Sequence, residues 1–238
     1  MNYNLRMKKI FYALTIIFCL LVFSCKSYNS TFDFDELKLE CEQNNITLST
    51  DDFYLTAFPQ NAKAGLIFYP GGLVSYEAYL PLMVKFAEQG FACVIVQMPS
   101  DFAILNSYAA YRVQMRYSEI SRWFLAGHSL GGAMAADYIA SHSGDFEGLI
   151  LLAAYSTKNL SNTNLKVLSV YGSKDEVLNK TNYQKYKSNL PNDFTEFVIE
   201  GGNHGHFADY GEQSGDGEAT ISRTEQQNLT AQKAAELL

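Results

Sequence analysis

Short runs of apolar and β-branched residues alternate with segments of helical periodicity along most of the chain. This alternation is typical of a mainly parallel β-sheet that is covered by helices on both faces. The runs that predict strands cover residues 64–69, 91–97, 123–127, 148–154, 166–171 and 194–199. Residues 46–56 are expected to add one or two edge strands. We therefore predict an α/β fold.

Helices are expected in the segments between these strands. The clearest pattern lies in residues 76–89, where apolar side chains recur at helical spacing before the chain stops at Gly90. Residues 130–141 are rich in alanine, and residues 181–190 precede Pro191. Ser222 and Glu225 form a capping-box pattern, which predicts that a C-terminal helix begins there.

The first 24 residues have the layout of an export signal. Arg6, Lys8 and Lys9 precede an uncharged apolar run over residues 10–23, which is short for a membrane-spanning helix. We expect residues 1–24 to be a signal peptide, residues 25–45 an N-terminal tether and residues 46–238 one folded domain. The alternatives are an uncleaved anchor or an ordinary cleaved signal, and all three place the domain outside the cytoplasm.

The end of the apolar run, Leu21-Val22-Phe23-Ser24-Cys25, resembles a bacterial lipoprotein signal. In such signals a small residue precedes the cysteine that becomes lipidated, and Phe23 departs from the tightest form of the pattern. The resemblance implies that Cys25 is lipidated and becomes the mature N-terminus. It also implies a lipoprotein of the bacterial cell envelope that is held on a membrane by this lipid.

Composition and charge limit the classes of function. The chain has 238 residues, of which 47% are hydrophobic and 18% charged, and this suits one domain with a sizeable core. Its net charge of −7 becomes more negative if residues 1–24 are removed, because they hold three basic and no acidic residues. An acidic surface repels phosphate groups, so nucleic-acid binding is disfavoured.

Cysteine and histidine spacing predicts no metal site. Cys41 and Cys93 remain once the N-terminal cysteines are set aside, and a disulfide between them is possible in an oxidising compartment. The simpler interpretation is that Cys93 is a small buried residue, since it lies within a predicted strand.

The main candidate for a catalytic residue is Ser129. It lies in Gly127-His128-Ser129-Leu130-Gly131-Gly132, between a predicted strand and an alanine-rich helix. A nucleophile elbow needs such a sharp strand-to-helix turn, and flanking glycines remove side chains that would collide there. The N–H of Leu130 would then face a developing oxyanion at the helix N-terminus. The alternative is a glycine-rich turn whose serine only caps a helix. His128 is expected to have a structural role only.

Two further candidates follow predicted strands. Asp175 comes after residues 166–171, and His204 comes after residues 194–199. Catalytic groups gather at the carboxyl ends of strands in open α/β sheets, and Ser, Asp, His is the order found with a nucleophile elbow. Loop placement alone does not separate His204 from His206.

Together these segments resemble the α/β-hydrolases, in particular the compact subgroup related to dienelactone hydrolase. From residue 64 to the C-terminus, the resemblance rests on Tyr69-Pro70-Gly71-Gly72, Pro99-Ser100-Asp101-Phe102-Ala103, the Ser129 motif, Tyr171-Gly172-Ser173-Lys174-Asp175, Asn203-His204, Asp209-Tyr210-Gly211 and Gly215-Asp216-Gly217. In that subgroup the histidine after Gly-Asn is catalytic, which favours His204. Dienelactone hydrolase itself uses cysteine as nucleophile, so its substrate is not carried over.

The resemblance implies a serine hydrolase that cleaves carboxylic esters or thioesters through an acyl-enzyme, with Ser129, Asp175 and His204 as triad and no cofactor. The oxyanion hole would combine the N–H of Leu130 with that of Gly72 or its neighbour Leu73. Only about ten residues separate the strands at 148–154 and 166–171, which leaves no room for a cap domain and favours small ester substrates. A non-catalytic lipid-tethered binding protein and an acyltransferase with the same triad remain as alternatives.

Overall fold

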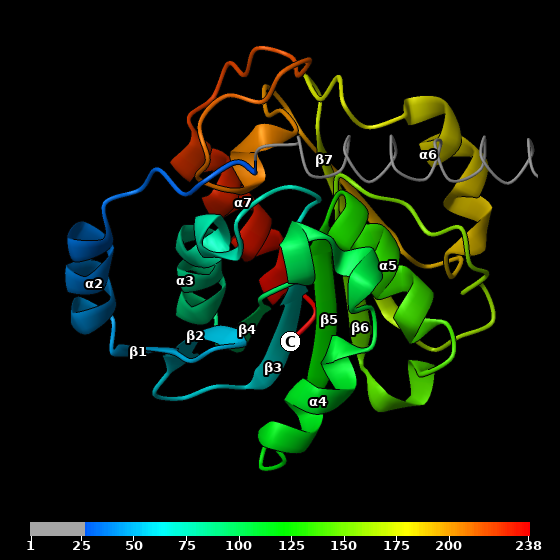
Figure 1. Cartoon of the computed structure of the whole chain (residues 1–238). Coiled ribbons are helices and arrows are strands. Elements are labelled where there is room, and N and C mark those ends of the chain that lie inside the picture. The colour runs from blue at the N-terminus through cyan, green and yellow to red at the C-terminus, as the bar shows by residue number, and fades with distance from the viewer. Residues whose placement is uncertain (1–26) are drawn as a thin grey trace, which may run out of the picture.

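The computed structural model describes residues 27–238 and contains one eight-stranded sheet (Figure 1). Its strand order is β1-β2-β4-β3-β5-β6-β7-β8, with antiparallel pairing of β1 with β2 and of β2 with β4, and parallel pairing from β4 to β8. The strands are β1 (Ile46–Thr50), β2 (Tyr54–Pro59), β3 (Ala64–Tyr69), β4 (Phe91–Val96), β5 (Trp123–His128), β6 (Gly148–Leu152), β7 (Lys166–Gly172) and β8 (Thr195–Ile199).

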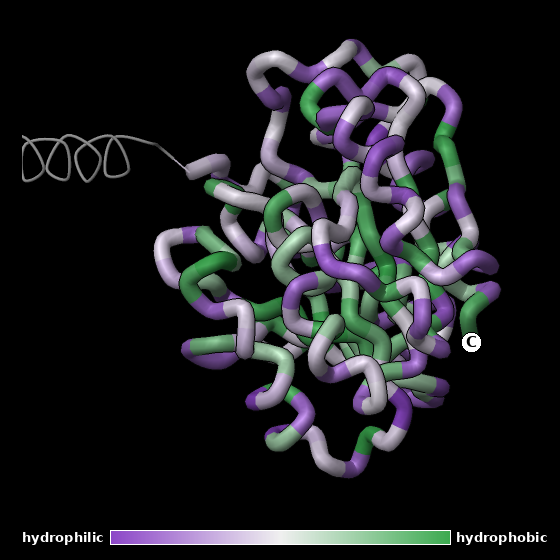
Figure 2. The backbone as a smooth tube through the Cα atoms, turned by 90° about the vertical axis from the view of Figure 1, so that its right-hand side faces the viewer, coloured by the Kyte–Doolittle hydropathy of each residue, from purple (hydrophilic) through white to green (hydrophobic). Residues whose placement is uncertain are grey.

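Helices cover both faces of the sheet and divide the core into two layers. On one face, residues of α2 (Phe34–Gln43), α3 (Leu80–Glu88) and α7 (Arg223–Ala235) share a buried cluster with the sheet. On the other, α4 (Ala109–Arg116) and α5 (Leu130–Ile139) do so. Figure 2 shows the central strands as the most hydrophobic part of the chain, surrounded by polar connections.

One further α-helix and several short 3-10 turns complete the connections. Helix α6 (Lys180–Tyr186) follows β7. The turns are η1 (Tyr76–Tyr79), η2 (Pro99–Asp101), η3 (Ala103–Leu105), η4 (Ser143–Asp145), η5 (Lys187–Asn189) and η6 (Gly205–Phe207).

The predicted fold class is confirmed, and so are the predicted strands and the C-terminal helix. Ser222 is the N-cap of α7, where its side chain accepts a hydrogen bond from the N–H of Glu225. Residues 46–56 supply β1 and the start of β2. Residues 153–165, which connect β6 to β7, form no helix, and the compact fold has no cap domain there.

The folded part of the chain starts before residue 46. Asp33 caps α2 through hydrogen bonds from the N–H groups of Asp35 and Glu36, and Leu37 and Cys41 of this helix enter the core. Part of the segment expected to be a tether is therefore packed on the domain. The pattern of apolar residues did not predict α2, because only Leu37 and Cys41 of its ten residues are buried. Helix α4 was not predicted either.

Several expectations concern residues that lie at or beyond the described N-terminus. The signal at residues 1–24 and the lipidation site Cys25 lie outside the described residues. Within residues 27–238, no helix combines the length and apolar character needed to cross a membrane.

Cys41 and Cys93 are both buried and form no disulfide with each other.

Candidate active site

Ser129 lies at the sharp turn between β5 and α5. Its backbone angles, φ 51° and ψ −120°, fall where side chains are rarely tolerated. The turn requires glycine on both sides: a Cβ on Gly127 would lie 2.5 Å from the carbonyl carbon of Gly131, and one on Gly131 would lie 2.1 Å from the carbonyl oxygen of Tyr69. These contacts give Ser129 the geometry of a nucleophile elbow.

Asp175 and His204 meet across the carboxyl ends of β7 and β8. The Nδ1 atom of His204 lies 2.9 Å from Oδ2 of Asp175, and both side chains are almost fully buried. The other carboxylate oxygen, Oδ1, accepts hydrogen bonds from the N–H groups of Val177 (2.9 Å) and Leu178 (2.8 Å). Asp175 is thus fixed in place and occupies the Nδ1 side of the imidazole, so that Nε2 is the nitrogen left for other chemistry.

His206 has different surroundings from His204. Its backbone N–H donates to Oδ1 of Asn203, and its buried Nδ1 has no hydrogen-bond partner among residues 27–238. Burial and the charge of Arg223 lower the pKa of His206. The structure therefore brings His204, rather than His206, to Asp175.

A hydrogen-bond network from α7 holds the loop that carries His204. Gln226 is fully buried, accepts from the N–H of Asn203 (2.9 Å) and donates to the carbonyl of the same residue (2.8 Å). Asp216 accepts from the N–H of Gly205 at 2.8 Å. The residues on both sides of His204 are thereby tied to other parts of the chain.

The turn after β3 lies against Leu130 of the elbow. The N–H of Gly71 donates to the hydroxyl of Tyr79, and that of Leu73 donates to the carbonyl of Asp101, each at 2.9 Å. Within residues 27–238 the N–H of Gly72 has no such partner. A Cβ on Gly72 would lie 3.1 Å from a side-chain carbon of Leu130, so the two expected oxyanion residues are neighbours. Of Gly72 and Leu73, Gly72 has the available donor.

His128 touches the catalytic histidine candidate directly. Its ring centroid is 4.5 Å from that of His204, and its Nδ1 lies 2.8 Å from the Tyr79 hydroxyl. The Tyr79 hydroxyl oxygen accepts a hydrogen bond from the N–H of Gly71, so the hydroxyl proton is available to donate to Nδ1 of His128. A neutral His128 then carries its single ring proton on Nε2. Burial, with a smaller effect from His204, lowers the pKa of His128 well below its usual value. A neutral imidazole therefore packs behind His204.

Ser129 and His204 open into one cavity of about 330 Å³. Small and apolar side chains form most of its wall: Leu130, Ala133, Met134, Ala153, Ala154, Val177 and Leu178, together with Tyr155, Thr157 and Asn179. Its volume lies at the lower end of the range for small-molecule sites, roughly 300–1,000 Å³. Within residues 27–238, no group of three or more His, Cys, Asp or Glu side chains could hold a metal ion.

A family model described as "Alpha/beta hydrolase family" matches residues 65–228, which run from β3 into α7 and include Ser129, Asp175 and His204. The chain belongs to this family. Membership in the α/β-hydrolases supports hydrolase activity and accounts for the elbow at the end of β5. No curated protein sequence matches the chain.

Solved structures show the same fold at low sequence identity. A predicted CIB-like hydrolase from Thermoplasma acidophilum has a TM-score of 0.63 and 14% identity, with 80% of this chain and 99% of that one covered. TT1662 from Thermus thermophilus has a TM-score of 0.59 and 17% identity, with coverage of 81% and 96%. MGS-MChE2, an α/β-hydrolase enzyme from a sediment metagenome of the Mar Chica lagoon, Morocco, has a TM-score of 0.55 and 14% identity. The match covers 68% of this chain and 91% of that one.

Sequence reasoning gave His128 a structural role but did not connect His128, Tyr79 or Gln226 with this site. Tyr79, His128 and Gln226 act on it from η1, β5 and α7, which are far apart along the chain. Only for Gln226 did the sequence contain a signal. Gln226 falls among the buried positions of α7, where a polar side chain needs a hydrogen-bond partner.

Proposed function

We propose that this α/β-hydrolase is a serine hydrolase that cleaves carboxylic esters or thioesters through an acyl-enzyme. Ser129 is the nucleophile, His204 the general base and acid, and Asp175 the residue that orients His204. The observation that carries the proposal is the 2.9 Å contact between His204 Nδ1 and Asp175 Oδ2 beside a cavity that Ser129 and His204 both line.

The mechanism has two steps. Ser129 Oγ attacks the acyl carbonyl while His204 Nε2 takes its proton, and Asp175 stabilises the imidazolium that forms. His204 then gives the proton to the leaving alcohol or thiol, which departs as the acyl-enzyme forms. Water, deprotonated by His204, next attacks the acyl-enzyme and releases the carboxylic acid and free Ser129.

The oxyanion of each tetrahedral intermediate would be bound by the N–H groups of Gly72 and Leu130. Such donors act only where charge develops, and the loss of one typically costs about 3–4 kcal/mol of transition-state stabilisation. The Leu130 donor gains from its place at the start of α5, where the helix dipole favours negative charge.

The cavity supports a small acyl group as substrate. It is lined by alanines and by medium-sized side chains such as Met134 and Leu178. The expected site of action is the bacterial cell envelope, through a lipid on Cys25, and this part of the proposal rests on the N-terminal sequence alone.

Labelling with a fluorophosphonate probe tests the proposal. The purified protein should be labelled stoichiometrically, and Ser129→Ala should abolish both labelling and hydrolysis of a soluble p-nitrophenyl ester. Ser118→Ala is the control, since Ser118 is exposed to solvent and outside the cavity. Absence of labelling in the wild-type protein would favour a non-catalytic binding protein, whereas acyl transfer to an added alcohol in preference to water would indicate an acyltransferase.

A further inference from the structure

The N-terminal strap, residues 27–33, lies beside the turn that carries Gly72. Tyr28 forms a parallel bridge with Val74: its N–H donates to the carbonyl of Leu73 at 2.7 Å, and its carbonyl accepts from the N–H of Ser75 at 2.9 Å. In Figure 1 this segment is the blue trace that precedes α2. The strap therefore binds the backbone just after the proposed oxyanion donor.

The strap also contacts the loop that follows His204. The N–H of Thr31 donates to the carbonyl of Asp209 at 2.8 Å, and the rings of Tyr28 and Tyr210 pack with their centroids 5.2 Å apart. The N–H of Ser214 reaches the hydroxyl of Tyr28 at 3.4 Å. One short segment thus bridges the loop of the proposed base and the turn of the proposed oxyanion hole.

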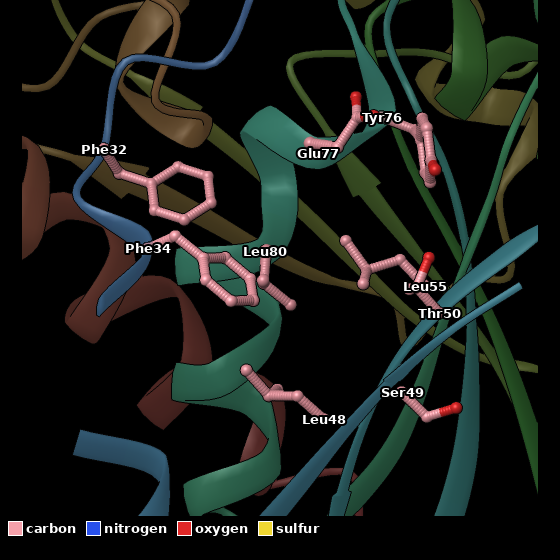
Figure 3. Close-up of a pocket in the computed structure, with 9 residues that line it drawn as sticks. All are labelled: Phe32, Phe34, Leu48, Ser49, Thr50, Leu55, Tyr76, Glu77 and Leu80. Carbon is pink, nitrogen blue, oxygen red and sulfur yellow. The ribbon is translucent and has the colours of Figure 1, made fainter. Parts of the chain in front are cut away.

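Apolar contacts hold the other end of the strap on the domain. Phe32 and Phe34 line a pocket of about 280 Å³ together with Leu48 and Leu55 of the first hairpin and Leu80 of α3 (Figure 3). Phe32 packs against the core cluster of this face. No member of the proposed triad lines this pocket.

The turn beneath the strap has a backbone conformation that needs support. Leu73 has φ 59°, and Asp101, whose carbonyl accepts its N–H, has φ 56°. Residues other than glycine hold such angles only where their surroundings leave no alternative. Leu73 is restrained on both sides, through its N–H by Asp101 and through its carbonyl by Tyr28.

We propose that the strap is a positioning element of the active site: the backbone of Tyr28 holds Leu73 in its left-handed conformation, and this aims the N–H of Gly72 at the oxyanion. The inference rests on the proposed function. It adds that a segment outside the matched family region, which starts at residue 65, takes part in transition-state stabilisation. Tyr28 itself touches no reacting atom.

Proline substitutions test the proposal because they remove single N–H groups. Tyr28→Pro removes the donor to Leu73, while Tyr28→Ala loses the ring but keeps that donor. We expect kcat/KM of Tyr28→Pro to fall about ten-fold or more below that of Tyr28→Ala, with KM changed little, since a lost oxyanion donor acts only in the transition state. The affinity for a boronic acid that mimics the tetrahedral intermediate should fall in parallel, which a merely structural role would not produce.

A second pair remains informative if Tyr28→Pro does not fold. Ser75 has φ −54°, which proline adopts without strain, so Ser75→Pro removes the other strap hydrogen bond. Ser75→Ala is its matched control, because both variants lose the hydrogen bond from Ser75 Oγ to Glu77. We expect a several-fold fall in kcat for Ser75→Pro relative to Ser75→Ala. Equal kcat/KM and equal boronic-acid affinity within each folded pair would overturn the proposal.

Hydrogen exchange separates this inference from the proposed function. Amides of residues 73–75 in Tyr28→Pro, and those of Leu73 and Val74 in Ser75→Pro, should exchange faster than in the alanine controls, whether or not the protein hydrolyses esters. Unchanged exchange in an active enzyme would refute the role of the strap alone. Faster exchange in a protein that no fluorophosphonate labels would support the strap's role in holding the turn and would refute the proposed serine hydrolase activity.

Discussion

His204 and His206 lie two residues apart in one loop, but only His204 contacts Asp175 and lines the cavity together with Ser129. His204→Ala should lower kcat on a soluble ester by about four orders of magnitude or more, as Ser129→Ala should, because triad residues act as a unit. The double variant should lose little beyond either single one. His206→Ala should retain most of the activity, since the bond from residue 206 to Asn203 uses the backbone. The reverse result would assign the base to His206.

His128 should make the stability of the protein depend on pH in mildly acidic solution. Burial lowers its pKa in the folded state, so below about pH 6.5 the unfolded chain binds a proton that the folded chain does not. The free energy of unfolding should therefore fall as the pH falls below 6.5, by up to about 1.4 kcal/mol per pH unit from this residue.

Urea unfolding between pH 4.5 and 7.5 measures this effect. His128→Asn keeps an amide near the Tyr79 hydroxyl and cannot titrate, so its stability should fall less steeply with decreasing pH than that of the wild type. His142→Asn serves as the comparison, because this histidine lies at the end of α5, away from the cavity. Parallel curves for wild type and His128→Asn would show that His128 is not the titrating group.

Among the helices, α7 has the most direct effect on the site. Its buried polar residues Gln226, Gln227 and Thr230 face inward, and Gln226 satisfies both backbone groups of Asn203. Gln226→Leu should destabilise the fold by about 2–4 kcal/mol, since it leaves a buried N–H and a buried carbonyl without partners.

The same substitution should lower kcat, because Asn203 directly precedes His204. Gln232→Leu is the matched control on the exposed side of α7 and should change neither property. Chemical denaturation and ester hydrolysis on the two variants provide the measurements. If Gln226→Leu and Gln232→Leu have the same free energy of unfolding, the hydrogen bonds between Gln226 and Asn203 do not contribute to stability.

The strands were more predictable than the helices for a physical reason. Strands β3 to β6 are buried at every position, so their apolar runs identify them without reference to neighbours. Helix α4 buries only Ala109, Ala110 and Val113, and α2 buries only two residues. Each of these helices buries few residues, and its position depends on contacts with distant parts of the chain.

The molecule as a whole leaves the cavity without a cap, and this leads to a prediction about substrates. Hydrolysis should favour short acyl chains over long ones, because the cavity of about 330 Å³ is walled by Ala133, Ala153 and Ala154. Activity should show no jump when a substrate passes its micellar concentration. A series of p-nitrophenyl esters of graded length measures both properties, and equal turnover of long-chain triglycerides would contradict the prediction.

The N-terminal sequence predicts how the molecule is attached to a membrane. Cys25 is three residues from Tyr28, so a lipid on Cys25 would hold Tyr28 within about 11 Å of the lipidated residue, given the span of an extended chain. Mass spectrometry of the mature N-terminus should show a diacylated or triacylated Cys25. Cys25→Ala should prevent this modification, and an unmodified Cys25 or a start well beyond it in the wild type would refute the anchor.

The sequence by itself determined the fold class, the main strands and the identity of the nucleophile candidate, because these depend on local patterns: apolar runs, glycines around Ser129 and a cap at Ser222. Resemblance to a family was needed to favour His204 over His206. Only the tertiary structure decided that His204 faces Asp175 and that the residues from Tyr28 onward pack on the domain. It also decided that, within residues 27–238, the N–H of Leu73 has a hydrogen-bond partner and that of Gly72 has none. Each of these depends on contacts between segments that are distant in the chain, and such contacts leave no periodic pattern in the sequence.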